Sequence, residues 1–270
     1  MSFDRRIGII AGGGSLPYLI AENNKDAYIV RLEPFWNDMK LLQFTGMNSR
    51  IDKIGFIMRG LKRQDITDVV FVGNVARPKI SSLRPDATTW AILGKILVSL
   101  ISRGDDALLR GIRNAFETRG FAVHGIQDLV QGLMAPKGLL TKKEPDDAAL
   151  RDIDRGIEAA RDHGAMDKGQ AIVVQHGRIL DVEGRDGTDA LIKRCAAFKT
   201  PGPGPVLVKT AKPGQDRAMD MPTIGPETVQ NAVSAGFAGI AVEAGSTILA
   251  DKFRLIELAD QHGLFMIGVE

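Results

Sequence analysis

The residues best suited to chemistry lie in one loop, which follows the apolar run at residues 206–208. Three cations, two carboxylates and an amide fall within twelve residues: Lys209, Lys212, Gln215, Asp216, Arg217 and Asp220. Proline at 213 and 222 prevents a helix here. Cations match phosphate oxygens, and carboxylates are the hard oxygen ligands that Mg²⁺ prefers. The loop suits a phosphorylated substrate with a divalent metal, and the plainer interpretation is a solvated loop with surface ion pairs.

A second candidate site follows the first predicted strand, residues 6–11. Three glycines come next, Gly12, Gly13 and Gly14. Ser15 is placed to cap a helix whose first turn tolerates Pro17. A strand, a glycine turn and a helix N-terminus predict an anion cradle of free backbone N–H groups. Pro17 replaces the third glycine of the dinucleotide pattern and no Walker lysine follows, so phosphate or a nucleotide diphosphate is favoured over NAD or ATP. A tight turn without a ligand is the alternative.

Another loop follows the predicted strand at residues 68–72. It contains Gly73, Asn74, Val75, Ala76 and Arg77. Ligands of open parallel sheets bind at the carboxyl ends of the strands, so we expect this loop beside the glycine turn. Arg77 offers a forked donor for phosphate or carboxylate. Asn74 is either a ligand or only a turn residue.

The order of the predicted elements indicates an α/β protein with two domains. Residues 1–134 alternate strands and helices in the manner of a Rossmann-like parallel sheet. Residues 135–270 form a C-terminal α/β catalytic domain. Within the first domain we predict a helix at 88–102 and a new helix after Gly104, which places Asp105 in a first helical turn where the dipole favours a carboxylate. A metal or ribose contact is the alternative for Asp105.

The second domain adds a predicted hairpin and a further loop. Residues 169–175 and 178–182 read as two strands around His176-Gly177. The loop at 183–189 is rich in glycine and acids and leads into a helix. Thr188 and Asp189 in that loop are candidates for ligand contact or for capping the helix.

Composition bounds the function. The chain has 270 residues, a net charge of +2 and few aromatics, which does not suggest nucleic-acid binding. The single cysteine, Cys195, excludes an internal disulfide and is expected to be a buried apolar residue. No signal peptide is recognisable, and no apolar run approaches the roughly 18 residues of a membrane span. We therefore expect a cytoplasmic protein.

Seven motifs occur in a specific order: AGGGSLP, GNVARP, GDDALL, DKGQAIVV, EGRDGTDALIKR, VKTAKPGQDRAMDMPTIG and GIAVEAG. Each is weak alone, but together they resemble the UDP-2,3-diacylglucosamine pyrophosphatases of lipid A biosynthesis. The resemblance is to the two-domain type that lacks metallophosphoesterase motifs. It extends from about residue 6 to residue 269.

The resemblance implies a Mg²⁺-dependent hydrolase, with Mn²⁺ or another divalent cation as the alternative. Its substrate would be UDP-2,3-diacylglucosamine, bound between the two domains. Water would attack the β-phosphorus and release UMP and 2,3-diacylglucosamine 1-phosphate (lipid X). The resemblance also implies a bacterium that makes lipopolysaccharide. An amphipathic substrate suggests transient peripheral contact with the cytoplasmic face of the inner membrane, and a homodimer is left open.

Site residues follow from the matched motifs. The family's DxP element falls on Asp220-Met221-Pro222. The preceding QDLRxDLP pattern reads QDRAMDMP here, with the arginine one place earlier. The predicted catalytic residues are Asp220, Asp216, Lys209 and Lys212, the two aspartates as metal ligands and the two lysines against the phosphates. The predicted substrate-binding residues are Gly12, Gly13, Gly14, Ser15, Gly73, Asn74, Val75, Ala76, Arg77, Asp105, Gln170, Thr188, Asp189, Gln215 and Arg217.

Two other functions remain open at this level. A nicotinamide-dependent oxidoreductase would use the Rossmann-like half, although the third glycine of its fingerprint is missing. A non-catalytic nucleotide-sugar binding protein would use the same loops without turnover. A metallophosphoesterase is disfavoured, because the four histidines are scattered without ligand spacing. Whether Asp220 binds metal or orients the attacking water is also open.

Overall fold

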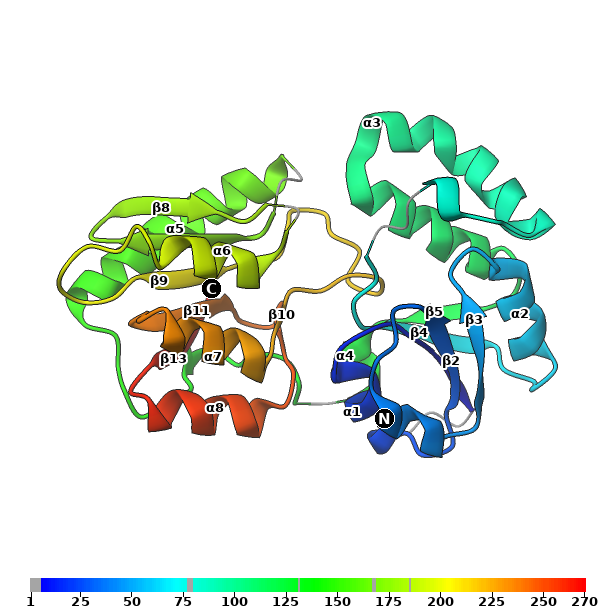
Figure 1. The fold of residues 1–270 in the computed structure, drawn as a ribbon, viewed down its shortest axis with the longest axis horizontal. Helices are drawn as coiled ribbons and strands as arrows, with labels where there is room; N and C mark the ends of the chain where they lie inside the picture. The colour runs from blue at the N-terminus through cyan, green and yellow to red at the C-terminus, as the bar shows by residue number, and fades with distance from the viewer. Residues whose placement is uncertain (1–5, 77–79, 131, 167–168, 185) are drawn as a thin grey trace. The chain divides into compact units, whose positions relative to one another are not determined.

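The computed structural model of the chain describes residues 6–76, 80–130, 132–166, 169–184 and 186–270. The chain forms two compact α/β units, as predicted (Figure 1). Unit 1 comprises Met1–Gln131 and Asp216–Asp220. Unit 2 comprises Gly132–Gln215 and Met221–Glu270. The sequence predicts a division after residue 134 with the whole charged loop in the second domain, whereas Asp216–Asp220 belongs to unit 1.

Unit 1 is built on a parallel sheet with the order β3-β2-β1-β4-β5, which confirms the Rossmann-like prediction. Its strands are β1 (Ile7–Ala11), β2 (Tyr28–Glu33), β3 (Gly46–Arg50), β4 (Asp68–Val72) and β5 (Ala122–His124). The strand order reverses at β1, which lies between β2 and β4. The loops after β1 and β4 therefore flank the point where sheets of this kind bind ligands.

The helices of unit 1 correct one prediction. They are α1 (Leu16–Asn23), α2 (Ile54–Lys62), α3 (Ala87–Glu117) and the short α4 (Ile126–Leu129), with 3₁₀ turns η1 (Met39–Gln43) and η2 (Ile80–Ser82). The predicted break at Gly104 is wrong, because α3 is continuous over 31 residues. One interior glycine costs a helix only about 1 kcal/mol relative to alanine. Residue 105 is therefore mid-helix rather than in a first turn.

Strand β3 is the part of this sheet that the sequence does not reveal. Its residues, GMNSR, contain no apolar run, and only Ser49 among them is buried. The strand lies at the edge and pairs with β2 from Ile29↔Gly46 to Glu33↔Arg50. Backbone hydrogen bonds form the strand here, and the side-chain pattern carries little signal.

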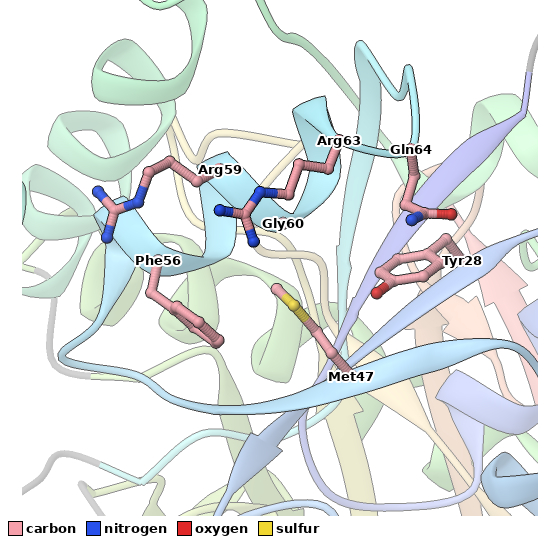
Figure 2. A pocket seen from close by; sticks show the side chains of 7 residues that line it. All are labelled: Tyr28, Met47, Phe56, Arg59, Gly60, Arg63 and Gln64. Atoms are coloured by element: carbon pink, nitrogen blue, oxygen red, sulfur yellow. The ribbon is translucent and has the colours of Figure 1, made fainter.

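A depression of about 440 Å³ lies between α2 and the edge strands β2 and β3 (Figure 2). Its apolar lining comes from Tyr28 of β2, Met47 of β3 and Phe56 of α2. Arg59 of α2 and Arg63, the C-cap residue of that helix, lie four positions apart and border it. In the part of the chain that the structure describes, neither guanidinium has a hydrogen-bond or ion-pair partner.

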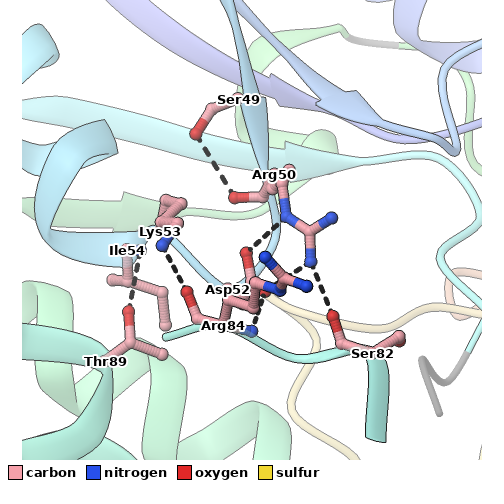
Figure 3. Close-up of polar contacts among 8 residues, drawn as sticks. All are labelled: Ser49, Arg50, Asp52, Lys53, Ile54, Ser82, Arg84 and Thr89. Atoms are coloured by element: carbon pink, nitrogen blue, oxygen red, sulfur yellow. Dashed lines mark hydrogen bonds and ion pairs between the residues drawn. The ribbon is translucent and has the colours of Figure 1, made fainter. Parts of the chain in front are cut away.

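Buried Asp52 joins the end of β3 to the segment before α3 (Figure 3). Its carboxylate accepts two hydrogen bonds from the Arg50 guanidinium, at 3.0 and 2.6 Å, and one of 2.6 Å from the backbone N–H of Arg84. The hydrogen bond from Arg50 is the main cause that lowers the pKa of Asp52. The network holds together segments more than thirty residues apart.

Unit 2 contains a mixed sheet with the order β6-β13-β11-β9-β7-β8. Its strands are β6 (Gly138–Leu139), β7 (Ala171–Gln175), β8 (Arg178–Val182), β9 (Val206–Lys209), β11 (Gly239–Glu243) and β13 (Phe265–Val269). The strands β9, β11 and β13 are parallel, and β7 runs against β9. A separate pair joins β10 (Thr223–Ile224) to β12 (Ile248–Leu249).

Helices cover both faces of this sheet. They are α5 (Asp147–Ala165), α6 (Thr188–Cys195), α7 (Pro226–Ser234) and α8 (Lys252–Gln261). Alternation along β9 separates the layers: Val208 packs with Ile153 of α5, while Leu207 lies in the core cluster that contains Leu191 of α6 and Leu255 of α8. Helix packing on both faces therefore holds in place the end of β9, where Lys209 is the last residue.

Two further predictions for unit 2 are confirmed. The strands β7 and β8 form an antiparallel hairpin, with His176 and Gly177 at positive φ in its turn. Cys195 is fully buried in the core, and this burial raises the pKa of its thiol to about 12. A thiol in that state is a poor nucleophile near neutral pH. Among the helices of the described residues, none has both the length and the apolar character to cross a membrane.

Candidate active site

The glycine turn after β1 does not offer the free amides that the sequence suggested. Gly12 N–H donates to the carbonyl of Val72 at 2.8 Å, and Gly13 exchanges two backbone hydrogen bonds of 2.9 Å with Asn74. Gly14 N–H donates to Oδ1 of Asn37 at 2.9 Å. All three glycine amides thus have acceptors within the protein, so the glycines themselves do not add free N–H groups to the predicted cradle.

Close packing explains why glycine stands in both loops. A Cβ on Gly12 would lie 2.6 Å from the carbonyl oxygen of Asn74, and one on Gly73 would lie 2.6 Å from that of Gly13. Gly73 also has a φ of +96°, which glycine adopts readily. The two loops therefore pack tightly against each other at the point where the strand order reverses. Asn74, Val75 and Ala76 of the second loop are exposed there.

The other predicted residues of unit 1 receive mixed support. Ser15 stands at the N-cap position of α1, but its backbone is helical and its side chain makes no capping hydrogen bond. Pro17 does lie in the first turn. Arg77 and the side chain of Asp105 lie outside the described residues.

In unit 2, the carboxyl ends of β8, β9 and β11 bring polar residues to one edge of the sheet. Lys209 is the last residue of β9 and pairs with Ala171 of β7 and with Val242 of β11. Gln170 directly precedes β7, and Glu183 directly follows β8. This edge gathers the Gln170, Thr188, Asp189 and Lys209 of the sequence prediction into one neighbourhood, which we call the unit 2 edge cluster.

Lys209 is buried, with only 6% of its surface exposed. Its ammonium donates to the hydroxyl of Thr188 at 2.9 Å and to the carbonyl of Thr223 at 3.0 Å. These are its two acceptors among the described residues, and an ammonium carries three N–H donors. One donor of a fixed, partly desolvated cation is therefore left for a ligand.

Glu183 supplies the opposite charge. Its Oε1 accepts from the hydroxyl of Thr188 at 2.5 Å, and its Oε2 accepts from the backbone N–H of Gln170 at 2.8 Å. The hydroxyl of Thr188 thus accepts from Lys209 and donates to Glu183. Burying charges requires such pairing and hydrogen bonding, so this chain of contacts is what keeps a charged lysine in the interior.

Some buried polar atoms at the same edge have no partner. Among the described residues of unit 2, five buried side-chain atoms make no hydrogen bond: Gln170 Oε1, Asp189 Oδ1, Thr210 Oγ1, Asn231 Nδ2 and Thr247 Oγ1. Thr210 is 1% exposed and directly follows Lys209. Native proteins seldom leave buried polar atoms unpaired, because each costs about 1–3 kcal/mol. Three of them, on Gln170, Asp189 and Thr210, lie in or next to the unit 2 edge cluster, as expected of a site that completes its hydrogen bonds with a ligand.

Hydrogen bonds hold the first residues of the charged loop after β9. Thr210 N–H donates to the carbonyl of Gln170 at 3.0 Å, and Ala211 N–H donates to Oε2 of Glu243 at 2.7 Å. Lys212 N–H donates to Oε1 of Gln215 at 3.1 Å. The loop is therefore fixed at its start by residues that end or flank the neighbouring strands.

The next five residues, Asp216–Asp220, pack within unit 1. Asp216 Oδ1 accepts from Nη1 of Arg113 on α3 at 2.8 Å, and the Asp216 side chain is 9% exposed. Ala218 and Met219 pack against the hydrophobic core of unit 1. Asp220 is half-buried and Arg217 is exposed.

A magnesium ion fits these residues in one way. Mg²⁺ is commonly held by one or two carboxylates together with waters and substrate phosphates. Asp216 does not fit, because the adjacent Arg113 guanidinium would repel a cation. Asp220 is the other carboxylate of the predicted pair. Within the described ranges no group of three or more His, Cys, Asp or Glu residues could hold a metal, so phosphate oxygens would have to complete the coordination.

Several residues of this geometry are not among those predicted from the sequence. They are Arg113, Glu183, Thr210, Glu243 and Thr247. Glu183, Thr210 and Glu243 each end or directly follow a strand of the unit 2 sheet. A polar residue directly after an apolar strand was the signal that could have identified these three.

Comparison with known proteins agrees with the division of the fold. A family model described as the LpxI N-terminal domain matches residues 6–133, and one described as the LpxI C-terminal domain matches residues 136–267. A protein of Caulobacter vibrioides named UDP-2,3-diacylglucosamine pyrophosphatase LpxI is 38% identical over 276 residues, covering 98% of each chain. The motifs, the two α/β units and these matches coincide along nearly the whole sequence, and the chain belongs to the LpxI family.

Proposed function

We propose that this chain hydrolyses the diphosphate of UDP-2,3-diacylglucosamine by attack of water on the β-phosphorus. The products are UMP and 2,3-diacylglucosamine 1-phosphate, and the reaction belongs to lipid A biosynthesis. The observation that carries the proposal is the near full-length relative at 38% identity, whose name states this pyrophosphatase activity. The arrangement of Lys209 in the unit 2 edge cluster adds physical support.

The reaction needs charge neutralisation and an oriented water. The oxygen of water forms a bond to the β-phosphorus while the bond from that phosphorus to the bridging oxygen breaks. The bridging oxygen leaves with UMP, and negative charge grows on the phosphate oxygens. Protein groups that accelerate such a step do so mainly by positioning and electrostatic stabilisation.

Lys209 is suited to stabilising the negative charge on the phosphate oxygens. Its ammonium is fixed by Thr188 and Thr223 and charge-balanced by Glu183. A cation held in place in a low-dielectric surrounding stabilises developing charge without reorganising. We assign Lys209 to bind the phosphate oxygens of the substrate. Lys212, from the same loop, would bind them as a second cation. The unpartnered hydroxyl of Thr210 supplies a neutral donor beside Lys209.

Asp220 is the residue we assign to the metal. Bound Mg²⁺ would supply neutralisation of phosphate charge and a more acidic water. Asp220 would hold this ion together with substrate phosphate oxygens, or orient the attacking water. Asp216 has a different part, since its carboxylate is paired with Arg113.

Membrane contact is a further part of the proposal, because the substrate carries acyl chains. The surface beside α2 supports it: Phe56 is 47% exposed and lines the same depression as the uncompensated Arg59 and Arg63. Two like charges one helical turn apart repel each other, and anionic lipid head groups would relieve that repulsion. Aromatic side chains with basic neighbours are typical of surfaces that bind the face of an anionic bilayer.

Vesicle flotation tests the membrane contact. Wild type is expected to float with vesicles that contain phosphatidylglycerol, less so at high salt, and not with phosphatidylcholine alone. Arg59→Glu/Arg63→Glu should lose this binding. The matched control is Arg151→Glu/Arg155→Glu, two arginines with the same spacing on α5. No flotation of wild type, or equal loss in both variants, would reject this surface.

Product analysis tests the reaction itself. The purified chain with Mg²⁺ should convert UDP-2,3-diacylglucosamine to equal amounts of UMP and the acylated sugar 1-phosphate, and UDP-glucose should be a poor substrate. Binding without turnover would instead favour a nucleotide-sugar binding protein. Oxidation or reduction of added NAD(P)H would favour the oxidoreductase alternative.

A further inference from the structure

A short segment of the C-terminal half is built into unit 1. The chain belongs to unit 2 up to Gln215 and again from Met221, whereas Asp216–Asp220 belongs to unit 1. The segment ends at the aspartate to which the proposed function gives a direct part in the reaction. What holds this segment therefore bears on where that carboxylate lies.

One ion pair anchors the start of the segment. Nη1 of Arg113 lies 2.8 Å from Oδ1 of Asp216, across 103 positions of sequence. The Asp216 side chain is 9% exposed and that of Arg113 is 35% exposed, so the contact is largely shielded from water on the aspartate side. The Nε of Arg113 donates to Glu117 at 2.8 Å, which holds the guanidinium from its other edge.

Backbone hydrogen bonds link Asp216 to Asp220. Oδ1 of Asp216 also accepts from the N–H of Ala218 at 3.0 Å. The Asp216 carbonyl accepts from the N–H groups of Met219 and Asp220, both at 2.9 Å. A shift of Asp216 would therefore carry the whole turn, and Asp220 with it.

Apolar packing alone would not give this precision. Ala218 and Met219 are only partly buried against the core of unit 1. Hydrophobic contact is non-directional, whereas a charge-assisted hydrogen bond from a guanidinium has a defined geometry. The ion pair gives Asp216 a defined position, and the apolar side chains of Ala218 and Met219 add contact area against the core.

We propose that Arg113 is a positioning residue that acts through Asp216 to fix Asp220 for the reaction. Arg113 has no role in this account as a substrate ligand, and Asp216 is an anchor rather than a metal ligand. The inference rests on the proposed function for the part of Asp220, while the anchoring itself is independent of that function.

Kinetics of matched variants test the proposal. Arg113→Met and Asp216→Asn should each lower kcat about 10- to 100-fold, with KM changed much less, since small displacements of a reacting group cost up to about a hundredfold. The double variant should be no worse than either single one, because both break the same contact. Arg113→Lys, which keeps the charge, should recover most of the activity even if Arg113→Met folds poorly.

The Mg²⁺ concentration for half-maximal activity separates an anchor from a metal ligand. Under the proposal Asp216→Asn and Arg113→Met leave that concentration unchanged, whereas loss of a ligand would raise it. Arg119→Met is the control, because Arg119 lies just beyond the C-terminal end of α3 and, within the described part of the chain, its side chain bonds a single acceptor, the backbone carbonyl of Ala115. It should behave as wild type.

Amide hydrogen exchange gives a readout that does not depend on activity. The amides of Ala218, Met219 and Asp220 should exchange at least tenfold faster in Arg113→Met than in wild type or in Arg119→Met. Unchanged exchange, or additive kinetic losses in the double variant, would overturn the positioning role. Faster exchange in a protein that hydrolyses nothing would uphold the anchor and reject the proposed function.

Discussion

The ammonium of Lys209 lies 2.9 Å from the hydroxyl of Thr188, and that hydroxyl donates in turn to Glu183 at 2.5 Å. One threonine thus links a buried cation to a buried anion at the end of strand β9. In or next to the same cluster, three buried polar atoms, on Gln170, Asp189 and Thr210, have no partner among the described residues. A fixed cation among unsatisfied polar groups is the feature of unit 2 that best suits a phosphorylated ligand.

Removal of the cation should abolish most of the turnover. We predict that Lys209→Met lowers kcat by roughly a hundredfold or more, as for loss of a group that stabilises transition-state charge. Steady-state kinetics with UDP-2,3-diacylglucosamine provide the measurement. Lys199→Met is the control, because the one hydrogen bond of the Lys199 ammonium among the described residues goes to the carbonyl of Ala235. Equal activity of the two variants would exclude Lys209 from the reaction.

The linking hydroxyl should contribute to stability. Thr188→Val keeps the shape but leaves Lys209 and Glu183 each short of a buried partner. We expect the free energy of unfolding to fall by about 1–3 kcal/mol, and Thr188→Ser to restore most of it. Urea denaturation of the three proteins gives the comparison. Wild-type stability in Thr188→Val would mean that the contact contributes nothing to the fold.

Asp52 predicts a pH dependence of stability. The Arg50 hydrogen bond lowers the folded-state pKa of Asp52, so its carboxylate stabilises the fold at any pH above its ordinary unfolded value of about 3.9. This contribution is lost as the pH falls from about 4 through the lowered folded pKa.

Asp52→Asn should therefore have a lower Tm than wild type at pH 7, and the difference should shrink below about pH 4. Thermal unfolding across this range checks the sign. Glu227→Gln is the control, an exposed acid on α7. A Tm difference that grows on acidification would contradict the assigned cause.

The metal assignment gives a separate prediction. Asp220→Asn should lose more than roughly a hundredfold in kcat. If Asp220 holds the ion, the variant should also require more Mg²⁺ for half-maximal activity. EDTA should stop the wild-type reaction, and added Mg²⁺ should restore it. Full activity in EDTA would remove the divalent cation from the account.

The fold was largely predictable because most strands are short apolar runs bounded by glycine or charge. The strands β1, β4 and β8 fall where the pattern places them. Strand β3 was not predicted, because it lies at the edge of the sheet and is held by backbone hydrogen bonds to β2, so its side chains show no apolar pattern. The false break at Gly104 arose because local composition cannot show that a long helix tolerates one glycine.

The candidate site was predictable only in part, for a physical reason. Local sequence identifies residue types after strands, such as Lys209 and Thr188. It does not show which donors are already used, so the glycine amides seemed available although Asn74 and Asn37 supply their tertiary partners. Nor does it reveal that Arg113 meets Asp216, a contact that only the folded chain creates.

The most direct test of the central claim is single-turnover hydrolysis of UDP-2,3-diacylglucosamine in ¹⁸O-labelled water with Mg²⁺. Attack at the β-phosphorus places the label in the acylated sugar 1-phosphate and leaves UMP unlabelled, and this is the result we predict. Label in UMP would mean attack at the α-phosphorus. Absence of hydrolysis by the wild-type chain would contradict the proposed function altogether.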